Sequence, residues 1–296
     1  MGSKITRSKN YSTTIDGSDD DRLEKLFESG SSELFSTARE MAKGKQKILC
    51  SPSIINAYCM TEPECRHCKW RSMKKERKNF TSKRSLEEVV RRAVELEKEG
   101  INRIFLPSGW MGYELPDYFY DYVQAVRNAV DTEIFGLFGA VDGLSLLRLK
   151  NAGMDGYLCG IESPNNKVYM NFRPGGDTLE KRIETLYHAK ELGLKVWTGF
   201  LYGLGETKDD IKWALKMFRD VDADSVSILP FEPFPDTDME SCDPPNLYEW
   251  ARVLAVTKIF LGNEVNMFVQ FSNQNYHSFG LHAGANGFYF FPGSRP

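Results

Sequence analysis

The sequence predicts a closed (βα)8 barrel, an α/β fold of the TIM type, with a helical extension at its N-terminus. Two observations support this prediction. From residue 47 onward, about eight short apolar segments alternate with helical segments, which implies parallel strands joined by right-handed crossovers. Eight such units fit into roughly 250 residues, the usual size of this barrel. A doubly wound open sheet is the main alternative.

The composition limits the class of protein. Of the 296 residues, 41% are hydrophobic and 27% are charged, which is ordinary for a globular chain and excludes wholesale disorder. A net charge of -3 gives no overall reason to bind nucleic acid or an anionic membrane. No apolar run approaches the roughly 18 residues of a membrane span, and residues 1–21 hold no signal-peptide run. We therefore expect a cytoplasmic protein with reduced cysteines and no nucleic-acid or membrane partner.

The chain is expected to divide into a flexible N-terminal arm, residues 1–20, and one barrel domain, residues 21–296. The domain includes one or two N-terminal helices within residues 20–44. Strands are predicted over residues 47–57, 101–107, 132–138, 155–162, 195–202, 224–230, 265–271 and 286–291. Helices are predicted over residues 85–99, 116–130, 143–152, 177–193, 207–220, 246–261 and 273–283.

Local signals mark where several helices begin and end. Ser85 and Glu88 fit a capping box, in which each side chain bonds the backbone amide of the other residue. Gly100 supplies the left-handed residue that ends the same helix. Asp177 and Thr207 are the expected caps of two later helices. In a barrel of this kind, ligands bind at the carboxyl ends of the strands, so the loops that follow the strands are where functional residues are expected.

Three of the six cysteines lie in one loop after the first strand. Cys59, Cys65 and Cys68 have the spacing C-x5-C-x2-C, and clustered cysteines in a reduced chain indicate a metal site or catalysis. Three thiolates can hold three irons of a cubane cluster and leave the fourth iron open to a substrate or cofactor. A structural zinc site with a histidine ligand, or three inert thiols, are the alternatives. The other cysteines are expected to be buried or inert: Cys50, Cys159 and Cys242.

On this loop the chain resembles the radical S-adenosylmethionine (SAM) superfamily, whose usual spacing is C-x3-C-x2-C. The longer spacing is similar to that of the HmdB (HcgA) proteins, which are linked to the guanylylpyridinol (FeGP) cofactor of [Fe]-hydrogenase. Over residues 33–292 the chain also resembles biotin synthase and the [FeFe]-hydrogenase maturase HydE. The resemblance implies a [4Fe–4S] cluster on Cys59, Cys65 and Cys68, with SAM on the open iron.

The same resemblance implies SAM contacts at the ends of the second and fourth strands. Ser108 and Gly109 stand where the family receives the SAM amino group, and Trp110 replaces the acid of the family's motif. Glu162 is expected to pair with Arg182 and to orient the SAM carboxylate and ribose, because a guanidinium can bond both carboxylate oxygens.

Further contacts are expected around this pair and at the fifth strand. Arg173 is a second candidate for the SAM carboxylate, and Gly160 stands where relatives carry another basic residue. A surface ion pair of little energetic value is the alternative for Glu162. In the glycine-rich end of the fifth strand, Gly203 and Leu204 are expected to meet the adenine through their backbone.

The resemblance implies an enzyme that reductively cleaves SAM to a 5′-deoxyadenosyl radical, which takes hydrogen from a small substrate such as a pyridinol precursor. A biotin synthase-like or HydE-like activity is one alternative, and a zinc-binding barrel protein is another. Residues 66–84 hold nine basic residues and one acidic residue. Such a run is usually a solvated face, but it also suits an acidic electron donor of the flavodoxin or ferredoxin type. The sequence assigns no catalytic residue.

Overall fold

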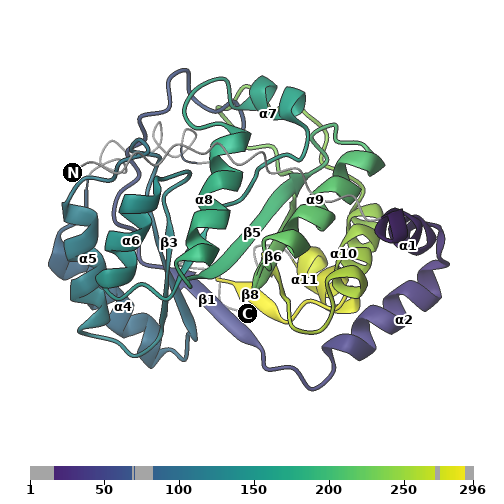
Figure 1. Ribbon diagram of the computed structural model, residues 1–296, viewed down its shortest axis with the longest axis horizontal. Coiled ribbons are helices and arrows are strands. Elements are labelled where there is room, and N and C mark those ends of the chain that lie inside the picture. The colour runs from purple at the N-terminus through teal and green to yellow at the C-terminus, as the bar shows by residue number, and fades with distance from the viewer. Residues whose placement is uncertain (1–16, 69, 71–82, 271–273, 291–296) are drawn as a thin grey trace, which may run out of the picture.

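The protein is described by a computed structural model that covers residues 17–68, 70, 83–270 and 274–290. Eight parallel strands follow one another in sequence order around a closed barrel, and the eighth strand pairs with the first (Figure 1). The predicted fold class is therefore confirmed. The strands are β1 Ile48–Pro52, β2 Arg103–Pro107, β3 Glu133–Leu137, β4 Gly156–Leu158, β5 Lys195–Tyr202, β6 Ser225–Pro230, β7 Asn266–Gln270 and β8 Gly287–Tyr289.

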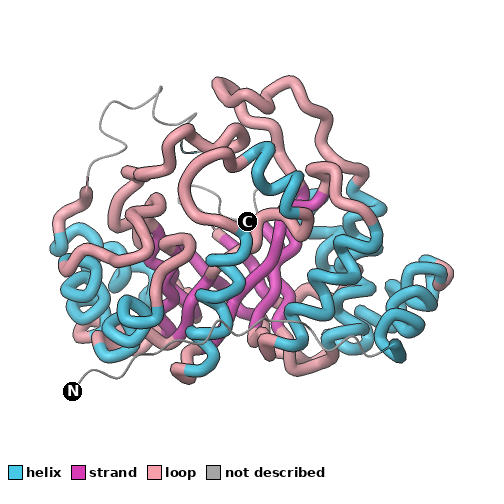
Figure 2. Tube along the Cα trace, turned by 45° about the horizontal axis from the view of Figure 1, so that its top comes forward, coloured by secondary structure: helices cyan, strands magenta, loops and turns pink. Residues whose placement is uncertain are grey.

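Helices surround the strands, and long loops gather beyond one end of the barrel (Figure 2). No helix among the described residues is both long and apolar enough to cross a membrane. The helices are α1 Gly17–Glu28, α2 Ser31–Ala42, α4 Leu86–Lys98, α5 Tyr118–Arg127, α6 Gly143–Asn151, α7 Asn166–Phe172, α8 Leu179–Glu191, α9 Lys208–Asp220, α10 Leu247–Leu261 and α11 Gln274–His282.

The expected helix caps are observed at three of the four positions. Ser85 and Glu88 form both bonds of the capping box, Thr207 caps α9, and Gly100 has the expected left-handed conformation after α4, with a φ of 83°. The expected cap at Asp177 is wrong by one residue: Thr178 accepts the bond from the Lys181 amide. The Asp177 side chain is instead completely buried, and it pairs there with Arg173 and Arg182.

The ends of two strands also differ from the prediction. Regular pairing of β1 ends at Pro52 and that of β4 ends at Leu158. In both cases the chain continues beside its neighbour through single hydrogen bonds, such as the one from the Ile55 amide to Pro107 and the one from the Ile161 amide to Gly199. The helix α7 was not predicted.

Large aromatic side chains fill the middle of the barrel. The ring of Trp197 lies between those of Phe268 and Tyr289, with centroids 3.9 and 5.1 Å away, and its indole nitrogen donates to Ser227 Oγ at 2.7 Å. This packing leaves no polar group of the indole unpaired. Because the middle of the barrel is filled in this way, the cavity that opens at the carboxyl ends of the strands cannot extend through it.

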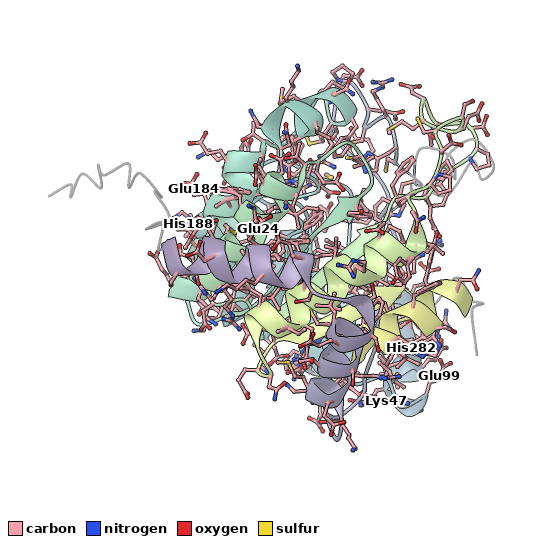
Figure 3. The ribbon with its side chains drawn as sticks, turned by 90° about the vertical axis from the view of Figure 1, so that its right-hand side faces the viewer. Glu24, Lys47, Glu99, Glu184, His188 and His282 are labelled. Carbon is pink, nitrogen blue, oxygen red and sulfur yellow. The ribbon has the colours of Figure 1, made fainter. Side chains whose placement is uncertain are left out.

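The N-terminal helices pack beside α9 and α10, the face seen in Figure 3, where Glu24 is labelled on α1. Leu23 is completely buried, and acidic residues of α1 pair with basic residues of α9. Asp20 Oδ1 lies 2.6 Å from Lys216 Nζ, and Glu24 Oε2 lies 3.0 Å from Lys212 Nζ. The helix begins at Gly17, so the predicted arm over residues 1–20 is too long; its first 16 residues lie outside the described part of the chain.

Candidate active site

A cavity of about 350 Å³ lies at the carboxyl ends of the strands. All the predicted metal and cofactor residues line it except Gly203 and Leu204. Those that line it are Cys59, Cys65, Cys68, Ser108, Gly109, Glu162, Arg173 and Arg182. The fold thus brings together residues from the loops after β1, β2 and β4 and from helix α8, as expected for a barrel of this class.

The cysteine loop is held in place from two sides. The Met60 amide donates to the Trp110 carbonyl at 2.8 Å, and the Arg66 amide donates to the Phe172 carbonyl at 2.8 Å. Gly109 approaches the loop so closely that a Cβ there would lie 2.2 Å from the Tyr58 carbonyl oxygen. Such a distance is a severe overlap, so the turn after β2 accepts only glycine at this position.

The three loop thiols suit an iron–sulfur cluster. Cys65 is buried, whereas Cys59 and Cys68 are partly exposed, and none of them forms a disulfide. Burial raises the pKa of the Cys65 thiol to about 12, so metal binding must displace its proton. Among the described residues, no three His, Cys, Asp or Glu side chains are placed to hold a single metal ion. A cubane cluster asks for a different arrangement, in which each thiolate binds its own iron, and soft thiolate donors match it.

His67 belongs to the same loop but is suited to packing. Its ring lies edge-on to Phe172 with centroids 4.8 Å apart. Burial lowers the pKa of the imidazole to about 4, so the ring is neutral near pH 7. Of the other cysteines, Cys50 and Cys159 are buried as expected, whereas Cys242 is exposed, because it lies on the surface loop before α10.

In the same cavity, the expected pair of Glu162 and Arg182 forms. Arg182 Nη1 donates to Glu162 Oε1 at 2.7 Å and to the Gly160 carbonyl at 2.5 Å. Burial opposes ionisation of Glu162, but Arg182 and Arg173 together hold the pKa of its carboxyl below the usual value. The pair is thus a charged group inside the protein, where screening by water is weak, and the alternative of a surface ion pair is wrong.

The backbone of Glu162 is itself unusual. Its φ is 61°, in the left-handed region where a side chain other than glycine is uncommon. The Leu201 amide donates to the Glu162 carbonyl at 2.9 Å, which fixes this conformation against β5. Residues held in this way gather at functional sites, and here the conformation presents the carboxylate to the cavity.

The structure does not bring Gly203 and Leu204 to this cavity. Their amides donate to the Glu206 carboxylate, at 2.6 and 2.9 Å, and Gly203 borders a separate hollow next to Pro245 and α10. From this part of β5, Leu201 lines the main cavity. The adenine contact of Gly203 and Leu204 stays a prediction.

Sequence reasoning missed several residues that line the cavity and one that lies behind it. Leu137, Leu229 and Gln270 line the cavity from the ends of β3, β6 and β7. The alternation of inward and outward residues along each strand could have indicated them. Asp177 was also missed, because from sequence it fits a helix cap.

The comparison with known families identifies the chain. The model of the radical SAM superfamily matches residues 55–218, more than half of the sequence and the region that carries the three cysteines, Glu162 and both arginines. The chain belongs to the radical SAM superfamily. Members of this superfamily use a [4Fe–4S] cluster and SAM.

Three curated relatives show which radical SAM proteins the chain is similar to. An uncharacterized protein of Methanocaldococcus jannaschii is 26% identical over 81% of this chain and 62% of that protein. The [FeFe] hydrogenase maturase subunit HydE of Thermotoga maritima is 31% identical over 77% of this chain and 65% of that protein. The biotin synthase of Thermodesulfovibrio yellowstonii is 24% identical over 85% of this chain and 77% of that protein. The chain therefore spans less than two thirds of the length of the first two relatives.

Solved structures support the same fold. The crystal structure of methylornithine synthase (PylB) superposes with a TM-score of 0.78, covering 94% of this chain and 83% of that one, at 21% sequence identity. At this identity the likeness concerns the fold. The sequence-based resemblance to the superfamily, to biotin synthase and to HydE is confirmed by these comparisons.

Proposed function

We propose that this protein is a radical SAM enzyme in which Cys59, Cys65 and Cys68 hold a [4Fe–4S] cluster. The observation that carries the proposal is one cavity lined both by the three thiols and by the buried ion pair of Glu162 and Arg182. When bound, the cluster supplies the electron that splits SAM into methionine and a 5′-deoxyadenosyl radical, which takes hydrogen from a small substrate. The chain's own residues bind and orient the reactants.

The residues that line the cavity suggest how SAM is held. The carbonyl groups of the turn at Ser108 and Gly109 suit the amino group, since Trp110 offers no carboxylate. Arg182 and Arg173 suit the carboxylate, because a guanidinium forms short, charge-assisted hydrogen bonds with it. Leu137, Leu201 and Leu229 form an apolar floor, which excludes water from the place where a radical would form.

For the pathway we propose a role in FeGP cofactor assembly, with a pyridinol or its precursor as the substrate. The C-x5-C-x2-C spacing supports this proposal. A maturase-like role is the second candidate, and the 31% identity to the HydE subunit favours it. The substrate separates the two: conversion of a pyridinol precursor would support the first role and contradict the second.

The electron is proposed to come from an acidic protein of the flavodoxin or ferredoxin type in the cytoplasm. The basic run over residues 66–84 supports this, although most of it lies outside the described residues. Steering between opposite charges weakens as salt rises. Reduction by flavodoxin should therefore slow as the ionic strength increases, and a rate indifferent to salt would contradict the proposed donor.

An anaerobic assay tests the central proposal. The protein is reconstituted with iron and sulfide, reduced with dithionite and given SAM, and 5′-deoxyadenosine is measured by chromatography. We expect the wild type to form it and Cys65→Ala to form none, because the cluster loses a ligand. Cys242→Ala is the matched control, since that exposed thiol lies outside the cavity, and it should keep full activity.

Two results would overturn the proposal. The first is a protein that takes up zinc instead of iron and forms no 5′-deoxyadenosine, which would favour a zinc-binding barrel. The second is full turnover by Cys65→Ala, which would show that other residues hold the cluster.

A further inference from the structure

Asp177 lies directly behind both guanidinium groups of the cavity wall. Its Oδ1 atom is 2.7 Å from Arg173 Nη2, and its Oδ2 atom is 3.0 Å from Arg182 Nε. The Oδ2 atom also accepts a hydrogen bond from the Ala140 amide at 2.8 Å. The carboxylate is completely buried, so solvent does not weaken these contacts.

Tyr169 completes the support of Arg173. Its hydroxyl oxygen accepts from Arg173 Nε at 3.2 Å and lies 3.1 Å from Asp177 Oδ1. Two of the three guanidinium nitrogens are thus fixed from behind. The third, Nη1, is 3.8 Å from Glu162 Oε1, which is longer than a hydrogen bond. Since Arg173 lines the cavity, Nη1 is the nitrogen left for a ligand.

The charges of this group balance only when Asp177 is ionised. Arg173 and Arg182 carry two positive charges, and Glu162 and Asp177 carry two negative charges. Although burial opposes ionisation of Asp177, the two guanidiniums hold the pKa of its carboxyl far below the usual value. Without this carboxylate two neighbouring buried cations would share one anion, an arrangement that is costly, and they would move apart.

We propose that Asp177 is a positioning residue that holds Arg173 and Arg182 in the orientation that receives the carboxylate of a bound ligand. This inference rests on the proposed function, in which that ligand is SAM and the carboxylate belongs to its methionyl part. Gly160 has no side chain to offer, so Arg173 is the second cation at this wall. A charge-assisted hydrogen bond from Nη1 of Arg173 to a ligand carboxylate requires a fixed orientation of the planar guanidinium, and Asp177 supplies it.

The test compares two ligands that are not cleaved and that differ in the amino acid part, which carries the carboxylate. S-adenosylhomocysteine keeps the amino acid part of SAM, whereas 5′-methylthioadenosine lacks it. Binding of each to the reconstituted protein is measured by anaerobic equilibrium dialysis. The variant Asp177→Asn keeps the size of the side chain and removes its charge. Loss of hydrogen bonds to a charged group predicts roughly 10- to 100-fold weaker binding of S-adenosylhomocysteine, with binding of 5′-methylthioadenosine unchanged.

Asp155→Asn is the matched control. Asp155 also bridges a backbone amide and an arginine: Oδ2 accepts from Ile134 at 2.8 Å and lies 2.9 Å from Arg127 Nη2. It precedes β4, at the opposite end of the barrel from the cavity, and binding of both ligands should be as in the wild type. Tyr169→Phe is a milder second variant for the case that Asp177→Asn does not fold. It should weaken the binding of S-adenosylhomocysteine and leave the binding of 5′-methylthioadenosine unchanged.

The possible outcomes separate the two proposals. If the wild type binds S-adenosylhomocysteine and Asp177→Asn binds it equally well, the positioning role is refuted and the proposed function stands. An equal loss of both ligands would also refute the role, since it would show a general structural defect. If the wild type binds neither S-adenosylhomocysteine nor SAM, the proposed function fails, and the inference fails with it.

Discussion

Gly109 offers a sharp test of how the cavity is built, because its contact with the cysteine loop can be perturbed by one methyl group. In Gly109→Ala the new Cβ would lie 2.2 Å from the Tyr58 carbonyl oxygen, 2.5 Å from Cys59 Cβ and 2.7 Å from Cys59 Cα. Ordinary contacts between such atoms begin at about 3.5 Å. The loop or the turn must therefore shift by roughly 1 Å.

The size of the effect follows from this overlap. Overpacking of this kind costs about 1–3 kcal/mol. For a domain of this size, each kcal/mol corresponds to a change in Tm of roughly 2–4 °C. We expect Gly109→Ala to lower the Tm of the metal-free protein by several degrees and to reduce the iron bound after reconstitution, since Cys59 is displaced.

The assay is thermal unfolding followed by circular dichroism, together with iron analysis of each variant. Gly30→Ala serves as the control, because an added Cβ there meets nothing within 4 Å and φ is -60°. A Gly109→Ala protein with the Tm and iron content of the wild type would refute the reasoning. It would show that the glycine is not needed for the approach of the turn to the loop.

The remaining predictions concern stability. Burial opposes ionisation of Glu133, but Arg103 and Lys195 hold the pKa of its carboxyl below the usual value; the stabilisation is present above the unfolded pKa of about 4.3 and is lost as pH falls through the folded value. Between pH 6 and 3 the Tm of the wild type should therefore fall more than that of Glu133→Gln, and parallel curves would contradict this. Ser85→Ala removes the acceptor for the Glu88 amide, 3.1 Å away, and should cost about 1 kcal/mol of unfolding free energy in urea. An unchanged urea midpoint would mean that the box adds nothing to the stability of α4.

The tests on Cys65 and Asp177 address chemistry rather than stability, and they probe two groups of residues at one cavity. Cys65→Ala removes a proposed cluster ligand, whereas Asp177→Asn keeps all three cysteines of the loop. A protein with normal iron content but weak binding of S-adenosylhomocysteine would show that the cluster and the carboxylate of the ligand are held by separate residues.

Much of the fold could be predicted because its signals are local. The alternation of apolar and helical segments, the capping box at Ser85 and Glu88, and the left-handed Gly100 each depend on a few neighbouring residues. The spacing of Cys59, Cys65 and Cys68 is local in the same way. The pairing of Glu162 with Arg182, twenty positions apart, could be expected because a superfamily pattern indicated it.

Other features depend on contacts between distant parts of the chain. Gly109 is needed because Tyr58, about fifty residues earlier, lies against it. Asp177 resembles a helix cap in sequence, and only its burial beneath Arg173 and Arg182 gives it a different role. Gly203 and Leu204 stand in a glycine-rich segment, yet the Glu206 carboxylate binds their amides.

The sequence by itself therefore determined the barrel, the cysteine loop and the superfamily. Only the tertiary structure decided which side chains share the cavity, which glycine is required by close contact, and which carboxylate supports the arginines. The physical reason is that helix caps and ligand spacing are set within a few residues, whereas burial and charge balance are set by whatever the closed barrel places next to each group.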